Sequence, residues 1–370
     1  MISGLLPPSV VRMVQRIDPV LLAALSLLIF WGGVTLYSAG DESNSLLFRQ
    51  GINFAVGVLA MLIFSQVRSK TLRQFAVWIY GAGVFLLILV LLVGVTKKGA
   101  QRWLYVGIDF QPSEVMKLAV PMMVAYFFSD RSLPPKFTDI LLALVIVMLP
   151  AVFIMKQPDL GTALLIAVSG LFVIYLAGIS WWLMGGAMVM VAVAAPLMFF
   201  YVLRDYQQQR VLTLLNQEAD LQGTGYHIHQ SKIAIGSGGL EGKGWLHGDQ
   251  SHLDFLPERH TDFIFAVFGE EFGFVGNLLL MGLYTFIIFR GLYLASKGED
   301  TFARLLAGSL SLTFFIYLLV NTGMVSGVLP VVGVPLPLVS YGGTSIVTLM
   351  SAFGIIMGMK KRKRIYQAES

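Results

Sequence analysis

The sequence predicts an all-α integral membrane protein with about ten transmembrane helices. Of its 370 residues, 56% are hydrophobic and only 13% are charged, which is too little polar surface for a soluble domain of this size. Many apolar runs approach the roughly 20 residues that cross a bilayer as a helix. Backbone groups in hydrocarbon must find partners inside the protein, and the alternating pattern of a membrane β-barrel is absent, so the runs are expected to be helices.

We read residues 1–370 as one polytopic membrane domain whose large loop, 203–261, lies between the seventh and eighth helices. Its other long connections are 96–113 and the proline-rich 326–343. The expected spans are 19–38, 48–66, 75–95, 114–129, 138–155, 161–179, 181–202, 262–289, 305–327 and 339–359.

Lysine and arginine set the expected orientation, because they favour the cytoplasmic side. With both termini assumed to be cytoplasmic, fifteen of the 26 basic residues lie on the cytoplasmic side, including the tail "KKRKR" at 360–364, and this bias supports the orientation. The loops 96–113 and 203–261 are then extracytoplasmic. They carry basic residues against this trend, including Lys97, Lys98, Arg102, Arg204 and Arg210. An anionic ligand at the outer face would explain them, and a solvated surface balanced by the loops' own acids is an equally open explanation.

Composition also excludes several kinds of site. The chain has no cysteine, which excludes disulfides and thiolate metal sites, and its five histidines are not clustered, so no structural metal is expected. The glycine-rich stretch 236–244 lacks the spacing of a nucleotide-binding P-loop, and no nucleic-acid partner is expected.

A carboxylate, Asp262, stands where the charged stretch "FLPERHTD" runs into an apolar one. One interpretation is a helix cap, since a carboxylate is favoured at a helix N-terminus. The other is a general base, which needs a carboxylate that is ionised yet poorly solvated. The sequence alone leaves both open.

Further ionisable residues lie within or near the spans. Glu114 and Lys117 are three residues apart and share a helix face, as a neutralised pair or as part of a site. Glu270 and Glu271 follow Asp262 by about two helical turns. Three roles are open for them: lining a polar cavity, binding a partner, or pairing with Lys117.

Two turns frame these residues. "QPDLGT" is expected to be a tight turn in which Asp159 caps the next helix. "VLPVVGVPLPLVSYGG" cannot form a regular helix because of its prolines, and broken backbone at membrane depth is tolerated only against protein or a cavity. We expect it to line a cavity mouth.

Together, "KGAQRWL", "FQPSE", "QPDLGT", "IAIGSGG", "GKGW", "FLPERHTDFIFAV" and the proline-rich stretch occur in the order typical of one family. From about the second span to the tenth, the sequence resembles the SEDS family (shape, elongation, division and sporulation). This resemblance implies a ten-helix peptidoglycan glycosyltransferase of the bacterial cytoplasmic membrane. Such an enzyme polymerises lipid II on the outer face during cell elongation and releases the polyprenyl diphosphate. The catalytic carboxylate of the family falls on Asp262, and its charged pair on Glu114 and Lys117.

The resemblance also implies partners: lipid II, a class B penicillin-binding protein transpeptidase, other elongation-complex proteins and membrane lipids. No cofactor is certain, and a divalent cation (Mg or Mn) is possible. The alternatives are a lipid II flippase, which suits many spans and a broken helix, and a non-catalytic cell-wall scaffold. The candidate substrate-binding residues are Lys97, Lys98, Arg102, Glu114, Lys117, Arg204 and Arg210.

Overall fold

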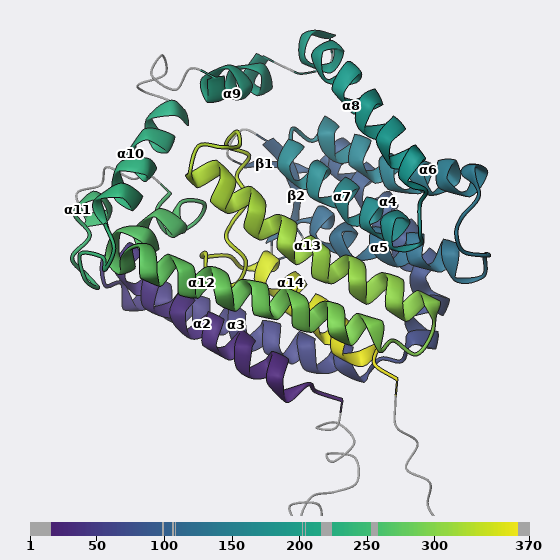
Figure 1. Ribbon diagram of the computed structural model, residues 1–370, viewed down its shortest axis with the longest axis horizontal. Helices are drawn as coiled ribbons and strands as arrows, with labels where there is room; N and C mark the ends of the chain where they lie inside the picture. Colours follow the sequence, from purple (N-terminus) through teal and green to yellow (C-terminus); the bar gives the residue numbers. More distant parts are fainter. Residues whose placement is uncertain are drawn as a thin grey trace, which may run out of the picture.

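A computed structural model of the chain describes residues 16–361, except 98–99, 106, 108, 202, 204, 216–223 and 253–257. The described chain is mostly helical, and every expected span corresponds to one helix (Figure 1). These helices are α2 (Pro19–Ala39), α3 (Asn44–Gln66), α4 (Ser69–Val93), α5 (Pro112–Ser129), α6 (Phe137–Lys156), α7 (Leu160–Leu176), α8 (Trp181–Tyr201), α12 (Ile264–Ser296), α13 (Thr301–Val325) and α14 (Thr344–Gly358).

Within the described ranges, seven of these helices are long and apolar enough to cross a membrane. Helices α7 and α14 are apolar but shorter, and α5 carries the charged residues Glu114 and Lys117 near its start. The expected all-α membrane fold is therefore confirmed, while the count of ten transmembrane passes stays a prediction.

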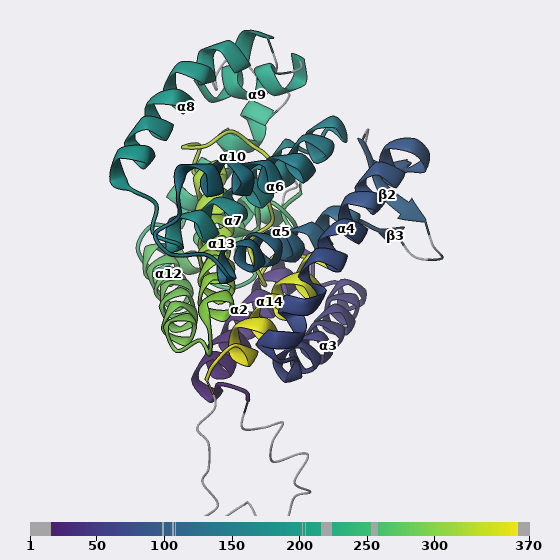
Figure 2. The same cartoon turned by 90° about the vertical axis from the view of Figure 1, so that its right-hand side faces the viewer.

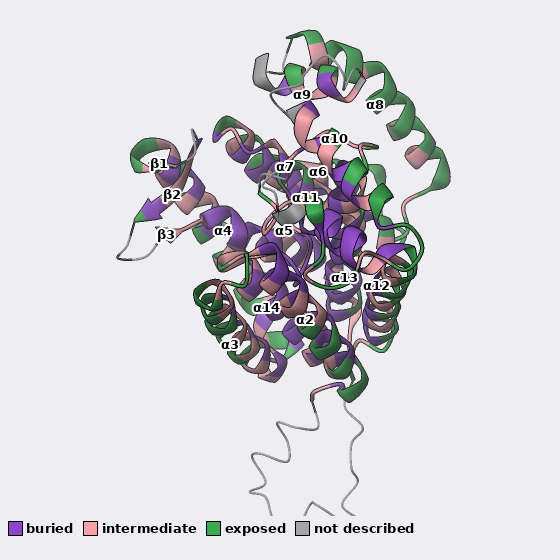
Figure 3. Ribbon diagram, turned by 90° about the vertical axis from the view of Figure 1, so that its left-hand side faces the viewer, coloured by how far each residue is buried: buried purple, intermediate pink, exposed green. Residues whose placement is uncertain are grey.

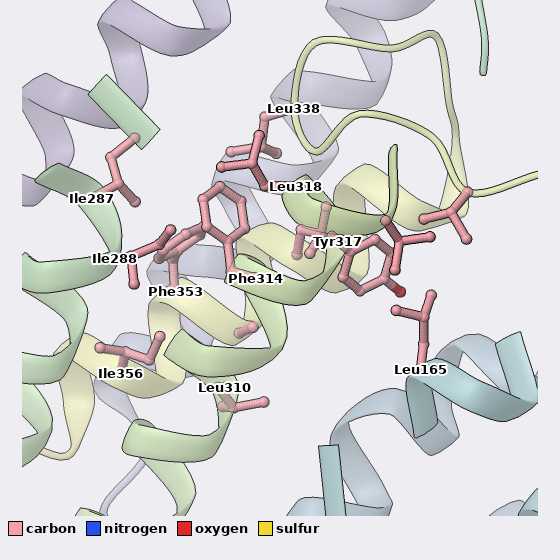
Figure 4. Packing of buried hydrophobic residues seen from close by; sticks show 14 of the residues in the cluster. Leu165, Ile287, Ile288, Leu310, Phe314, Tyr317, Leu318, Leu338, Phe353 and Ile356 are labelled. Carbon is pink, nitrogen blue, oxygen red and sulfur yellow. The ribbon is translucent and has the colours of Figure 1, made fainter. Parts of the chain in front are cut away.

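Helix α13 lies at the centre of the bundle and packs against α5, α7, α12 and α14. It is the most buried of the seven long apolar helices: 72% of its apolar stretch is buried, compared with 39% in α2 and α6. Figure 4 shows Phe314 of α13 packed beside Ile288 of α12 and Phe353 of α14, whereas Tyr317 of α13 lies toward Leu165 of α7. Helix α14 runs alongside α3 (Figure 2).

Apolar side chains cover much of the outer surface, where they would contact lipid. Examples are Phe30, Trp78 and Phe85, and the whole apolar window of α8 is unburied (Figure 3). Side-chain caps define where several helices begin: Asp18 accepts a hydrogen bond from the Leu21 amide, and Asp159 accepts one from Thr162. The expected cap at Asp159 is confirmed.

The two long loops contain secondary structure that the sequence analysis did not place. The connection 96–113 folds into an antiparallel sheet in the order β1–β2–β3, with strands Val95–Lys97, Ala100–Tyr105 and Asp109–Phe110. The connection 203–261 contains α9 (Asp205–Leu215), α10 (Thr224–Ser237) and α11 (Asp249–His252).

Helix α12 differs from the single uninterrupted span expected at 262–289. It begins at Ile264, extends to Ser296, and is broken at Gly273, whose φ of 63° and ψ of −162° are not helical. This backbone conformation is accessible to glycine and costly for other residues. The break separates a buried first segment, 264–272, from the long remainder of the helix.

Candidate functional site

Asp262 lies just before α12, in the turn 261–263, and is half-buried. The N-cap residue of α12 is Phe263, which makes no side-chain capping hydrogen bond. The interpretation of Asp262 as the helix cap is therefore wrong, because the helix starts one residue later than a cap at Asp262 requires.

The backbone around Asp262 is fixed by a buried asparagine of α13. The Asn321 side-chain amide donates to the Asp262 carbonyl and to the Val334 carbonyl, each at 2.8 Å. Asn321 is fully buried. One side chain thus joins α13, the turn before α12 and the coil between α13 and α14.

Residues near the C-terminal end of this coil, 326–343, also hold the turn before α12. The Ser340 hydroxyl donates to the Thr261 carbonyl at 2.6 Å, and the Tyr341 amide donates to the His260 carbonyl at 2.8 Å. A Cβ atom added at Gly333 would lie 3.4 Å from Asp262 Oδ2. The carboxylate therefore lies against the backbone of the proline-rich coil, which is non-helical as expected.

A cationic pocket adjoins this coil at Pro330 and Val332. Arg102 of β2 and Arg210 of α9 both line it, together with Asp159 and Gln207, around a small hollow of about 40 Å³ that is partly open to solvent. The structure thus brings together two arginines that are far apart in sequence and were expected to bind substrate.

Asp159 belongs to this pocket as well as to a helix cap. Arg102 Nη1 lies 3.4 Å from Asp159 Oδ2, and Arg102 also donates to the Pro158 carbonyl. The turn packs closely on the coil, because a Cβ at Gly161 would lie 2.7 Å from the Val332 carbonyl oxygen. The motif "QPDLGT" predicts a structural turn, but nothing in its spacing indicates the contact with Arg102.

Glu114 and Lys117 form the expected pair, with 2.6 Å between Lys117 Nζ and Glu114 Oε1. Both residues are buried, and Lys117 Nζ lies 5.3 Å from the centroid of the Tyr317 ring on α13. Tyr317 is four residues before Asn321, which is about 6 Å along one face of the helix. The pair therefore packs against α13 about one turn from the contact that fixes Asp262.

A second polar pocket lies on the N-terminal side of Asp262. It is a larger and more open hollow of about 440 Å³ between the turn after α2 and residues 258–260. Arg259 forms an ion pair with Asp41 at this site, and Arg49 and His260 also line it. The charges before Asp262 are evident in the sequence, but their pairing with a turn more than 200 residues away is not.

Other expected site residues cannot be placed at Asp262. Lys97 is the last residue of β1. Lys98 and Arg204 lie outside the described residues. In the part of the chain that the structure describes, no three His, Asp or Glu side chains gather as a metal-binding group.

Glu270 and Glu271 do not approach the pair on α5. Glu270 is fully buried and pairs with Lys243 at 2.8 Å, so the expected alternative of a pair with Lys117 is wrong. The arrangement as a whole offers a half-buried carboxylate whose backbone is held by hydrogen bonds, with a pocket lined by two arginines at the adjoining coil. Such a carboxylate can accept a proton while cations stabilise a leaving anion nearby.

Comparisons with known proteins agree over nearly the whole chain. A family model for the FtsW, RodA and SpoVE group, described as "Cell cycle protein", matches residues 14–365. The sequence is 49% identical over 351 residues, 95% of each chain, to "Peptidoglycan glycosyltransferase MrdB" of Escherichia coli K12.

Two solved structures share the fold. The first is a chain in a structure described as "Structural coordination of polymerization and crosslinking by a peptidoglycan synthase complex". It has a TM-score of 0.81 and 29% identity, covering 92% of this chain and 96% of that one. The second is the rod shape determining protein RodA of Thermus thermophilus, with a TM-score of 0.69 and 28% identity, covering 92% and 95% of the two chains.

Proposed function

The chain belongs to the FtsW, RodA and SpoVE family and is a peptidoglycan glycosyltransferase, and from this premise we propose how its residues polymerise lipid II. The family expected from the sequence motifs is thereby confirmed. The observation that carries the proposal is the placement of Asp262, a half-buried carboxylate held on one side of the coil 326–343 while two arginines line a pocket at the same coil.

The reaction joins two lipid-linked sugars. A sugar hydroxyl of one molecule attacks the anomeric carbon of the other, the bond from that carbon to the diphosphate breaks, and the polyprenyl diphosphate leaves with the bonding electrons. The hydroxyl proton passes to the Asp262 carboxylate, a contribution worth roughly 10² to 10⁴ in rate. Direct displacement of this kind inverts the anomeric carbon and requires no second carboxylate as nucleophile.

The leaving diphosphate requires positive charge. Arg102 and Arg210 supply it from the pocket that Pro330 and Val332 of the coil also line, and guanidinium groups suit phosphate oxygens because they donate two parallel hydrogen bonds. Lys97, Lys98 and Arg204 belong to the same two loops and are further candidates. The buried pair of Glu114 and Lys117 contributes to substrate binding from within the bundle.

The position of the site also fits the substrate. A lipid-linked sugar has its head at the membrane surface and its tail in hydrocarbon, so the base must lie where an apolar helix meets a polar loop. We place this site on the extracytoplasmic face, with both termini in the cytoplasm and with 203–261 as the large outer loop. A class B penicillin-binding protein is the partner that cross-links the product, and a solved relative belongs to a complex described as coordinating polymerization and crosslinking.

Polymerisation in detergent separates this function from its rivals. The complete chain would be purified with its penicillin-binding partner, whose transpeptidase is blocked, and incubated with lipid II in micelles. Because micelles have no second compartment, glycan strands can form only by catalysis. A flippase or a scaffold yields no strands under these conditions, and that result would overturn the proposal.

A further inference from the structure

Asp262 belongs to a short segment whose direction the rest of α12 does not determine. Residues 264–272 are helical, but the break at Gly273 interrupts the helix before its long remainder. At about 1.5 Å of rise per residue, Asp262 lies roughly 15 Å from this break. A tilt of the segment by about 4° would therefore move Asp262 by about 1 Å.

The loop that follows α10 forms backbone hydrogen bonds with residues on both sides of this break. The amides of Lys243 and Gly244 donate to the carbonyls of Glu270 and Glu271, each at 3.0 Å. In return, the Phe274 amide donates to the Gly239 carbonyl at 2.9 Å. Figure 1 shows α10 and α11, which flank this loop, beside the N-terminal end of α12.

Glycines allow this close contact. A Cβ atom at Gly242 would lie 2.1 Å from the Glu271 carbonyl oxygen, and one at Gly238 would lie 2.2 Å from the Gly269 carbonyl oxygen. The loop backbone therefore touches the backbone of the segment directly, so a displacement of one is transmitted to the other.

Two buried carboxylates fasten the segment to this loop. Glu270 is 0% exposed, and its Oε1 accepts from Lys243 Nζ at 2.8 Å and from the Gln250 amide at 3.1 Å. Glu271 is 1% exposed and accepts from the Leu246 amide at 3.2 Å and from the Ser38 hydroxyl of α2. A buried carboxylate without a cation is costly. The contact with Lys243 therefore offsets the cost of burying Glu270.

Lys243 stays protonated at neutral pH. Partial burial lowers the pKa of its ammonium group, whereas hydrogen bonds to Glu270 and Asp249 raise it, and the resulting pKa lies above the ordinary value of lysine. Asp249 is the exposed partner, at 2.9 Å, whereas Glu270 lies on the segment that follows Asp262.

From these contacts we propose that Glu270 and Lys243 are positioning residues for polymerisation, which hold the segment 264–272 and thereby place the Asp262 carboxylate. The proposal rests on the function assigned to Asp262. Glu270 does not touch the reacting atoms, and it acts through the direction of the segment. A displacement of about 1 Å at a reacting group costs on the order of 100-fold in rate.

The test measures lipid II polymerisation by the complete chain with its penicillin-binding partner, comparing wild type with Glu270→Gln and Asp249→Asn. Glu270→Gln is expected to lower kcat about 10-fold to 100-fold and to leave KM within about twofold, because binding pockets remain while the base is displaced. Asp249→Asn is the matched control, since it removes the exposed partner of the same lysine, and its kcat is expected to stay close to wild type.

A second comparison decides the matter if Glu270→Gln does not fold. Lys243→Arg keeps the charge and the reach to Glu270 and is expected to retain most of the rate, whereas Lys243→Met is expected to lose it. A wild-type kcat for Glu270→Gln, or equal rates for the arginine and methionine variants, would overturn the proposal.

The same assay separates this proposal from the function on which it rests. An inactive Asp262→Asn variant beside a fully active Glu270→Gln variant would contradict only the positioning role. A fully active Asp262→Asn variant would contradict the proposed function itself.

Discussion

Replacing Asn321 with alanine is expected to slow polymerisation, because this side chain fixes the backbone of the proposed base. Its amide donates to the carbonyls of Asp262 and Val334, each at 2.8 Å, from a fully buried position on α13. The variant removes both hydrogen bonds. It leaves two carbonyl oxygens without this donor and frees the turn before α12 from the coil 326–343.

The size of the effect follows from these two contacts. A hydrogen bond inside a protein contributes about 1 kcal/mol net, so the two together contribute about 2 kcal/mol. If this free energy appears in the placement of Asp262, the polymerisation rate falls about 30-fold, since each 1.4 kcal/mol corresponds to about tenfold.

The assay is the initial rate of glycan formation from lipid II by the purified complex, with thermal unfolding measured on the same samples. Thr322→Ala is the matched control, because the Thr322 hydroxyl donates only within α13, to the Leu318 carbonyl at 2.8 Å and more weakly to the Leu319 carbonyl. We expect this control to keep the wild-type rate. Equal rates for both variants would refute the reasoning that Asn321 positions Asp262.

Three further predictions concern the frame around the site. Gly242→Ala is expected to lower the thermal stability and yield of the folded complex, because its Cβ would lie 2.1 Å from a carbonyl oxygen and its φ is +85°; a wild-type melting temperature would contradict this. Removing either Glu114 or Lys117 alone is expected to cost about 3–5 kcal/mol of stability by leaving a buried charge unpaired. The double variant Glu114→Gln/Lys117→Met should recover stability but not polymerisation. Burial raises the pKa of Asp18, but hydrogen bonds from an arginine of α12 and from its own helix outweigh this, so its pKa lies below the ordinary value. Its stabilising contribution is therefore present above a pH of about 4 and is lost as the pH falls through the folded pKa, and Asp18→Asn should flatten this acid dependence of thermal unfolding.

Hydropathy was sufficient to locate the apolar helices of the bundle, but not α9, α10 and α11 of the loop 203–261. Each apolar run corresponds to one helix because a long apolar run in a bilayer has few other ways to satisfy its backbone. Proline was equally informative, since the coil 326–343 is non-helical as expected. The break inside α12 was missed because glycine is common in membrane helices, and Gly273 is distinguished only by the loop backbone that approaches it.

The candidate site was only partly predictable. The spacing of Glu114 and Lys117 predicted their contact, because residues three apart meet on a helix. The partner of Glu270 was not predictable, because Lys243 lies in the loop after α10, 27 residues earlier in the chain. The role of Asn321 also escaped detection, because a single polar residue in an apolar helix has no spacing signal that identifies what it binds.

The most direct test of the account is the polymerisation rate of Asp262→Asn. The substitution keeps the size of the side chain but replaces one acceptor oxygen with an NH2 donor, and so removes the carboxylate that accepts the proton. With the partner bound and the chain folded as in wild type, we expect a fall of roughly 10² to 10⁴ in rate. A wild-type rate from Asp262→Asn would contradict the account, because the reaction would then proceed without the proposed base.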